Sequence, residues 1–206
     1  MSKKIYSKIP LIEEINKTMS ALKQNGMEAY FVPDRKAAKE KVLQIIPKGS
    51  EVMNMTSVTL DSLSLSREIT NSNNYKSIRK ILSNMNRETE GLRMQQLGTA
   101  PSWAIGSVHA ITQNGQVIIA SNTGSQLPSY AYGATGVIWV VGVQKIVTDL
   151  NQGMDRIYQY VLPLESKRAK KAYGASGSNV SKLLIINKEI KPGRVHIILV
   201  NEVLGF

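Results

Sequence analysis

The middle of the chain is almost free of charge. Between residues 101 and 150 only Lys145 and Asp149 carry a formal charge, although the 206-residue chain holds 26 Lys and Arg and 15 Asp and Glu. A fifty-residue stretch with two charges cannot be mostly surface, because charged side chains are rarely buried and collect on the exterior. We therefore expect the centre of a sheet here. Its longest apolar run, 137–143, is about a third of the roughly 20 residues that a membrane-spanning helix needs.

A β-hairpin is expected just before this run. Two apolar, β-branched segments, 108–112 and 116–120, flank the dipeptide Asn114-Gly115. Asn-Gly between such segments is the strongest short-range signal for a hairpin with a type I′ turn.

Helices and strands alternate along the rest of the chain. Three- and four-residue spacing of apolar residues indicates helices, and short apolar runs bounded by turn residues indicate strands. The expected helices cover 10–25, 34–46, 154–162 and 163–173, the last beginning at Pro163, with a helical stretch at about 57–98; the expected strands cover 27–32, 51–55, 137–143, 183–187 and 195–200. This order predicts an α/β fold with three layers, a mostly parallel sheet flanked by helices, and one hairpin. Its length fits a single domain, 1–206.

Composition removes several kinds of chemistry. The chain has no cysteine, which excludes disulfides, thiol nucleophiles and cysteine-ligated zinc or iron–sulfur sites. Its two histidines, His109 and His196, cannot form a three-histidine metal centre. Its glycines fit neither the Walker nor the dinucleotide-binding fingerprint. We therefore expect no resident metal or cofactor.

The net charge of +11 favours an acidic or anionic partner. The basic residues are densest at 167–171, which is most simply a solvated helix face. Because few aromatic residues are available for base stacking and no nucleic-acid-binding motif occurs, nucleic acid is the least favoured partner. The N-terminal residues 1–6 lack the apolar segment of a secretory signal, so the cytoplasm is the expected location.

Polar loops after the expected strands are the first places to look for a site, because ligands bind outside the carboxyl ends of strands in open α/β sheets. One such loop follows the strand 51–55 and contains Thr56, Ser57 and Thr59. Its hydroxyl groups suit a phosphate or a carboxylate. The simpler interpretation is that Thr56 or Ser57 only caps the following helix.

A second polar loop follows the hairpin. We expect its side chains to bind the oxygens of a small hydroxy- or keto-acid, with Lys145 as the compensating cation. The residues proposed for this site are Asn114, Gln116, Asn122, Thr123, Gly124, Ser125, Gln126 and Lys145. Ordinary turn chemistry is the alternative.

His109 is a weak candidate for a general acid or base, because a histidine on an apolar strand is more often structural. Glu165 and Arg168 lie three apart on an expected helix and are most simply a surface ion pair. No Ser-His-Asp order and no catalytic carboxylate pair is found.

These segments resemble the LUD-domain family, that of lactate utilization protein C. The resemblance is strong over about half of the chain. It is carried by Ser102-Trp103-Ala104-Ile105-Gly106-Ser107-Val108-His109-Ala110, Asn114-Gly115, Ser121-Asn122-Thr123-Gly124-Ser125-Gln126-Leu127-Pro128, 137–143, 144–150, Arg156-Ile157, Leu162-Pro163-Leu164-Glu165, Ala172-Tyr173-Gly174 and Leu204-Gly205-Phe206. The hairpin departs from the better-known members, since Gln113-Asn114-Gly115-Gln116 stands where many carry an acidic Glu-Thr-Gly pattern.

The resemblance implies a fold like that of the sugar-phosphate isomerase and CoA-transferase group (NagB/RpiA-like). It also implies a role near lactate oxidation, beside iron–sulfur or other redox partner proteins. Whether the chain is itself an enzyme, or a homo-oligomer, is left open.

Three functions follow. The first is a LUD-type protein of lactate or organic-acid utilization that binds a small anionic metabolite, a carboxylate or a phosphorylated compound. The second is a stand-alone sugar-phosphate or acyl-CoA enzyme, which fold analogy alone cannot establish. The third is a basic nucleic-acid-binding protein.

Overall fold

The computed structural model describes residues 6–206, and its strands form two sheets. The expectation about an N-terminal signal falls mainly on residues 1–5, which lie outside the described residues. Within the described chain, no helix combines the length and the apolar character needed to span a membrane.

The larger sheet has six parallel strands. Their spatial order is β1 (Glu28–Val32), β10 (Val195–Val200), β7 (Gly136–Gly142), β4 (Trp103–Gly106), β2 (Glu51–Asn54) and β3 (Lys76–Ser77). Every residue of β7 is buried. A parallel strand covered on both faces reads as a continuous apolar run, so this observation confirms the sheet centre expected from 137–143.

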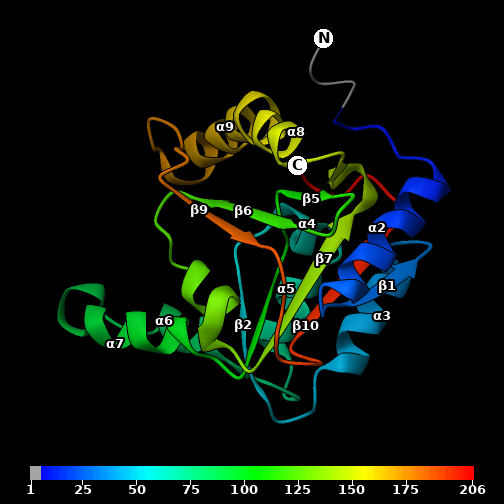
Figure 1. The fold of residues 1–206 in the computed structure, drawn as a ribbon. Coiled ribbons are helices and arrows are strands. Elements are labelled where there is room, and N and C mark those ends of the chain that lie inside the picture. Colours follow the sequence, from blue (N-terminus) through cyan, green and yellow to red (C-terminus); the bar gives the residue numbers. More distant parts are fainter. Residues whose placement is uncertain (1–5) are drawn as a thin grey trace.

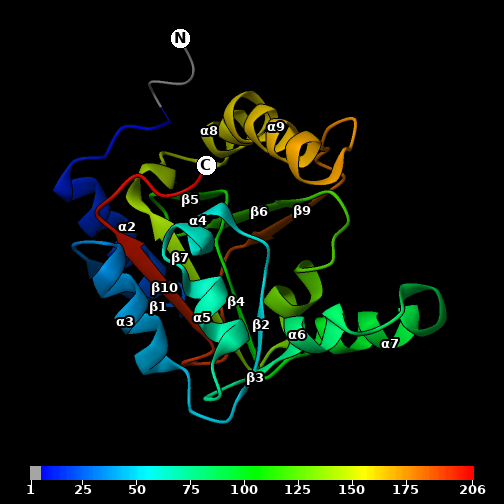
Figure 2. The same ribbon diagram turned by 180° about the vertical axis from the view of Figure 1, so that it is seen from behind.

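Helices cover one face of the large sheet. They are α3 (Arg35–Ile45), α4 (Val58–Ser62) and α5 (Leu65–Asn71). Figure 2 shows them in front of β10 and β4. Val42, Leu60 and Ile69 from these helices pack on Ile138 and Ile198 from the strands. The structure therefore confirms the predicted fold, a mostly parallel sheet flanked by helices.

The other face carries α2 (Ile12–Gln24) and the second sheet (Figure 1). The order in this sheet is β8 (Ile146–Val147), β5 (Ala110–Thr112), β6 (Val117–Ser121) and β9 (Lys182–Ile186). Val117 and Ile119 face the large sheet. Ala110 and Ile118 face the other way, toward Ile157 in the helical segment 150–173. The hairpin therefore builds a separate layer instead of an antiparallel edge of the main sheet.

The hairpin is confirmed, but the predicted turn type is wrong. A type I′ turn needs positive φ at both central residues, and in the described chain Ser64 is the only non-glycine residue with positive φ. Gly115 has φ of 78°, and its N–H donates to the carbonyl of Thr112 over 2.8 Å. This is a three-residue loop with glycine in the left-handed region. The Asn25 side chain donates to the Asn114 carbonyl over 2.9 Å and holds the loop against α2.

The helix predicted at 163–173 is confirmed as α9 (Leu162–Tyr173), but it is not separate from the helix before it. The chain stays helical through α8 (Leu150–Arg156), the π-helical turn Ile157–Val161 and α9 (Leu162–Tyr173). A proline inside an α-helix clashes with the carbonyl four residues earlier, which here is that of Gln159. Because Gln159 lies within the wider π turn, the helix passes Pro163 without ending. Gly174, with φ of 66°, ends it as expected.

The stretch 57–98 is mainly helical; the short edge strand β3 and loops at 63–64, 72–75 and 84–86 separate its helices. Its first part, α4 and α5, lies on the face of the large sheet. Its second part consists of α6 (Ile78–Ser83), which lies beside β2 and buries Ile78, and α7 (Arg87–Thr99), which projects from the body (Figure 1) and has no buried residue. Two short turns, Ser129–Gly133 and Val143–Lys145, complete the described elements.

We predict that Gly106→Ala destabilises the fold, because a Cβ at this position would lie 1.7 Å from the Tyr130 hydroxyl oxygen. Tyr130 is buried and packs edge-on against Trp139, with ring centroids 5.4 Å apart. Overpacking of this kind costs about 1–3 kcal/mol. Urea unfolding measures the loss. Gly91→Ala is the matched control: it meets nothing within 4 Å in the helix α7 and should be neutral or stabilising. Equal stability of the two variants would contradict the prediction.

Candidate functional site

The carboxyl ends of β2, β4 and β7 meet at one rim of the large sheet, because all three strands are parallel and adjacent. The loop after β2 contains Thr56, Ser57 and Thr59, the residue after β4 is Ser107, and the turn after β7 ends at Lys145. This is the edge at which open α/β sheets bind ligands.

Lys145 is the centre of this rim. Its side chain is buried, with 2% exposure, and its Nζ donates to three neutral oxygens: Thr59 Oγ1 and Ser107 Oγ at 3.1 Å, and the Val108 carbonyl at 3.2 Å. No carboxylate pairs with it among the described residues. Burial, and secondarily the charge of Arg156, holds the pKa of Lys145 well below its usual value.

A second cation supports the same loop. Arg79 donates from Nε to the Asn54 carbonyl over 2.8 Å and from Nη2 to Thr56 Oγ1 over 3.1 Å. In the described chain it too has no acidic partner. The loop 56–59 is therefore held between two cations, each bonded only to neutral oxygens.

The chain segment after β10 closes the rim. The Leu204 carbonyl accepts hydrogen bonds from Thr59 Oγ1 at 3.3 Å and from Gln144 Nε2 at 2.9 Å. Gly205 lies so close to Thr59 that a Cβ there would approach its Oγ1 to 2.4 Å. Gln144 Oε1 and Asn54 Oδ1 are buried acceptors without a donor among the described residues. The rim is thus a buried, polar and predominantly cationic cluster.

The structure separates the predicted site residues into three places. Thr59 and Lys145 meet directly, with Thr56 on the same loop. Ser57 accepts a hydrogen bond from the backbone of Leu60 and caps α4, as the simpler interpretation holds. The other predicted residues lie in the loop after β6 and in the hairpin turn.

The loop after β6 bonds mainly to itself. Ser121 Oγ donates to Gln126 Oε1 over 2.9 Å and accepts from the N–H of Gly124 over 2.8 Å, and the hydroxyls of Thr123 and Ser125 pair at 3.1 Å. Asn122 Oδ1 accepts from Ser181 over 3.2 Å. No hydrogen bond recorded between described residues joins this loop to Lys145, which bonds to Thr59 instead.

The hairpin turn lies against the end of α2. Gln116 Nε2 donates to Asn187 Oδ1 over 2.7 Å, and Asn114 accepts from Asn25. A shallow hollow of about 270 Å³ lies among them, lined by Asn25, Asn114, Gln116, Asn187 and Lys188.

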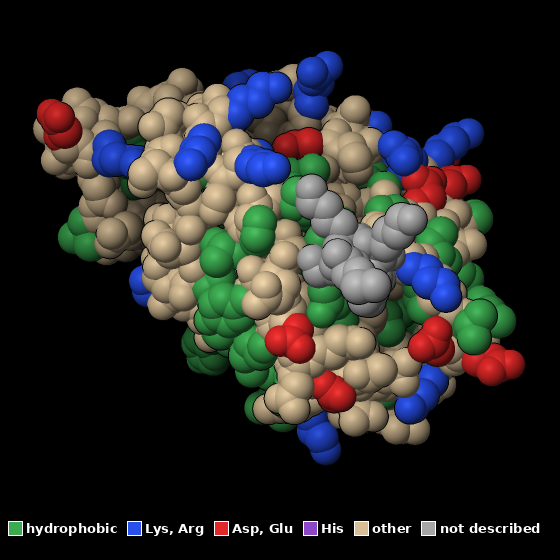
Figure 3. All heavy atoms as spheres, turned by 90° about the horizontal axis from the view of Figure 1, so that it is seen from above, with side chains coloured by type: hydrophobic (Ala, Val, Ile, Leu, Met, Phe, Trp, Pro, Cys, Tyr) green, Lys and Arg blue, Asp and Glu red, His purple; other side chains and the backbone are tan. Residues whose placement is uncertain are grey.

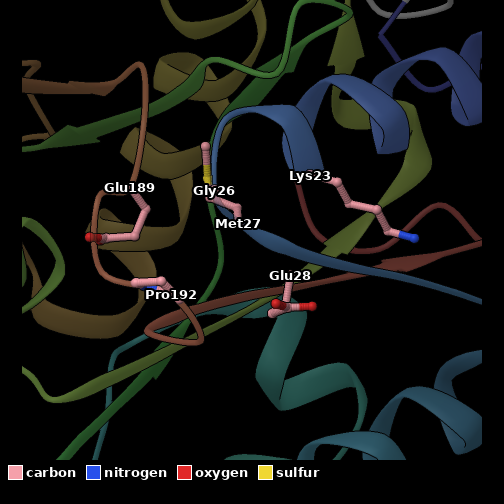
Figure 4. Close-up of a pocket in the computed structure, with 6 residues that line it drawn as sticks. All are labelled: Lys23, Gly26, Met27, Glu28, Glu189 and Pro192. Atoms are coloured by element: carbon pink, nitrogen blue, oxygen red, sulfur yellow. The ribbon is translucent and has the colours of Figure 1, made fainter.

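Another hollow, of about 310 Å³, lies at the amino end of β1 and is lined by Lys23, Gly26, Met27, Glu28, Glu189 and Pro192. In Figure 4 the Lys23 ammonium and the Glu189 carboxylate point in opposite directions. Glu189 instead pairs with Arg194 at 2.7 Å. The polar groups of this hollow do not converge, and the hollow lies at the opposite end of the strands from Lys145.

His109 has a structural environment. Its Nδ1 accepts the N–H of Ala120 over 3.1 Å, and its carbonyl accepts from Arg156 Nη1 over 2.6 Å. Burial, helped by the charges of Lys145 and Arg156, lowers the pKa of His109 to about 3. At neutral pH the ring is therefore neutral.

Sequence reasoning missed Ser107, Arg79 and Arg156. Ser107 follows a strand directly, so the rule that selected Thr56 would also select it. Arg156 is 0% exposed and lies on the buried face of its helix with Gly153 and Ile157. Its spacing of three residues from Gly153 was the signal in the sequence that could have placed it on that face. The bonds of Arg79 join residues 23 and 25 positions apart, for which the sequence holds no signal.

The surface above the rim is basic along one side. Figure 3 looks from above onto α8, α9 and the ends of the strands, and Lys and Arg side chains gather along its upper border. On α9, Arg168 forms the expected ion pair with Glu165 at 2.6 Å. Such a border attracts anions to this end of the molecule. Within the described residues, no three acidic or histidine side chains gather closely enough to hold a metal ion.

We predict that folding stability falls as the pH drops from about 6.5 toward 3. The pKa of His109 is lowered on folding, so the unfolded state binds more protons in this window and stability is lost as pH decreases. One pKa unit corresponds to about 1.4 kcal/mol; because the side chain is partly exposed, we expect a loss on the order of 2–4 kcal/mol. Urea unfolding across this pH range measures it. His109→Asn keeps an acceptor for Ala120 without titrating there, and an unchanged pH slope in that variant would contradict the assignment.

One solved structure shares the fold of this chain over nearly its whole length. A DUF162 family protein from Deinococcus radiodurans matches over 93% of this chain and 100% of its own, with a TM-score of 0.58 and 11% identity. Ribose 5-phosphate isomerase A from Neisseria gonorrhoeae matches over 56% of this chain and 54% of its own, with a TM-score of 0.35 and 10% identity. Ribose 5-phosphate isomerase from Plasmodium falciparum covers 78% and 79%, with a TM-score of 0.37 and 12% identity.

No curated protein matches the sequence. The model of the LUD domain family, in contrast, matches residues 15–200, which include both sheets and the polar rim around Lys145. The chain therefore belongs to the LUD domain family.

Proposed function

We propose that this chain is a cytoplasmic LUD-domain protein of lactate or related organic-acid utilization that binds a small anionic metabolite at the rim around Lys145. The observation that carries the proposal is the buried Lys145 ammonium, which touches two hydroxyls and a carbonyl and has no carboxylate partner in the described chain. Burying a charge without an opposite charge is costly. An anionic ligand, a carboxylate or a phosphorylated compound, would supply that opposite charge.

The neighbouring groups suit an anion. The Ser107 hydroxyl accepts from Nζ and can turn its proton toward a ligand oxygen, whereas the Thr59 hydroxyl donates to the Leu204 carbonyl and becomes available only when that segment shifts. Arg79 contributes a second positive charge through Thr56. The segment around Leu204 covers this cluster, so a ligand of any size requires that segment to shift.

We further propose that oxidation of the metabolite involves redox partner proteins. A chain without cysteine offers no thiolate ligand for an iron–sulfur cluster. The purified chain alone is then expected to give no lactate-dependent reduction of a dye acceptor. Turnover by the chain alone would contradict this part of the proposal.

We predict that Lys145→Met weakens anion binding at least tenfold, about 1.4 kcal/mol. Isothermal titration calorimetry with lactate, pyruvate, ribose 5-phosphate and inorganic phosphate measures the affinity, and a rise in melting temperature reports binding to the folded state. Lys170→Met is the matched control, because it removes the same charge from an exposed position on α9. Circular dichroism checks that both variants fold. Equal affinity of the two variants, or no binding of any of the four compounds at millimolar concentration, would overturn the proposal.

We also predict that anion binding weakens as the pH rises, and at a lower pH than for a site built on an exposed lysine. The pKa of Lys145 is lowered, so the ammonium loses its proton earlier than an exposed lysine would. An anion bound to Nζ favours the protonated form, so its affinity falls once the amine becomes neutral. Titrations at several pH values test this, and a flat profile would mean that Lys145 does not contact the anion.

A further inference from the structure

Arg156 lies outside the Lys145 rim and has bonding capacity that the fold does not use. It is the last residue of α8, directly before the π turn, and its side chain is 0% exposed. Nη1 donates to the His109 carbonyl over 2.6 Å. Nε and Nη2 are buried and have no hydrogen-bond partner among the described residues. Buried donors without a partner are rare and cost about 1–3 kcal/mol each.

The unused atoms form one edge of the guanidinium, and the same protein shows what that edge binds. Arg35 donates from Nε and Nη2 to a single carboxylate, that of Glu202, over 2.8 and 2.6 Å. Arg168 does the same with Glu165, over 2.7 and 2.6 Å. The two N–H groups of Arg168 bind both oxygens of the Glu165 carboxylate, and those of Arg35 bind one oxygen of Glu202. Arg156 presents this edge with no acid to fill it.

The surroundings of Arg156 favour a carboxylate of low charge. No ion pair between described residues includes Arg156, and although burial lowers its pKa to about 10, it stays cationic at neutral pH. The Tyr160 ring lies 5.3 Å from the guanidinium, and the Tyr6 ring lies 5.8 Å from that of Tyr160. Aromatic rings near the guanidinium match an apolar substituent better than a doubly charged phosphate.

Of these two aromatic residues, Tyr6 is the less constrained. Tyr6 belongs to no helix or strand and is only half-buried, whereas Tyr160 is fixed within the π turn. Displacing Tyr6 breaks no backbone ladder, so of the two it can move at the lower cost.

We propose that the free edge of Arg156 is a second anion site, which binds the carboxylate of a small monocarboxylic acid through both Nε and Nη2. The site does not depend on the Lys145 rim. Lys145 and Arg156 donate to the neighbouring carbonyls of Val108 and His109, but Lys145 has all three of its N–H groups engaged whereas Arg156 has two nitrogens free.

The direct test observes Arg156 in the intact, ¹⁵N-labelled protein by NMR. The Arg156 Nε–Hε resonance is assigned by its loss in Arg156→Lys, or through backbone and side-chain experiments if that variant does not fold. Sodium acetate and sodium lactate are expected to shift this resonance in a saturable way, in the unsubstituted protein and equally in Lys145→Met. Sodium chloride at the same ionic strength is expected to leave it unchanged. No saturable shift with either carboxylate, or a larger effect of sodium phosphate, would overturn the proposal.

The matched variants test the bidentate contact by calorimetry with acetate and lactate. Arg156→Lys keeps the charge but loses the two-pronged edge; in the Lys145→Met background, where the rim no longer contributes, it is expected to bind these acids at least tenfold more weakly than Lys145→Met alone. Arg168→Lys in the same background changes an edge that Glu165 already fills, and is expected to bind as Lys145→Met does. Equal affinity of these two double variants would show that the edge binds no carboxylate. Loss, in the double variant Arg156→Lys/Lys145→Met, of the binding that Lys145→Met retains would separate this site from the rim.

Discussion

The burial of β7 on both faces is the constraint on which the rest of the structure depends. A seven-residue parallel strand without an exposed side chain needs an apolar layer on each side. On one side α3, α4 and α5 supply that layer, and on the other α2 and the second sheet do. Because the second sheet cannot leave its own outer face bare, the long helix 150–173 covers it. Each layer is thus required by the one beneath it.

The same constraint creates the candidate site. At the carboxyl ends of β2, β4 and β7, Lys145 is buried and bonds to Thr59, Ser107 and the Val108 carbonyl. A buried ammonium among hydroxyls and carbonyls is electrostatically incomplete, and so is the guanidinium of Arg156 under the long helix. Two buried cations without acids in the described chain, in a protein of net charge +11, make the binding of anions the consistent interpretation.

Local sequence patterns predicted a structure correctly where that structure depends on one segment alone. They failed where contacts with another segment decide the structure. Asn114-Gly115 predicted the hairpin, but the bond from Asn25 and the negative φ of Asn114 decided its turn type. Pro163 predicted a helix start, but the π turn before it let the helix continue. Thr59 and Lys145 were both predicted as site residues, yet they were assigned to different loops. Their contact spans 86 residues, and no local pattern encodes it.

By itself, the sequence determined the alternation of helices and strands, the buried centre at 137–143 and the lack of thiol chemistry, because periodicity, charge depletion and composition are properties of neighbouring residues. Only the tertiary structure decided that the hairpin forms its own sheet, that the loop 121–126 bonds to itself, and that Lys145 turns toward Thr59 and Ser107. It also decided that Arg156 is buried with one edge unfilled. These outcomes depend on which surfaces must be covered and on which donors then lack a partner, and both are fixed only when distant segments pack.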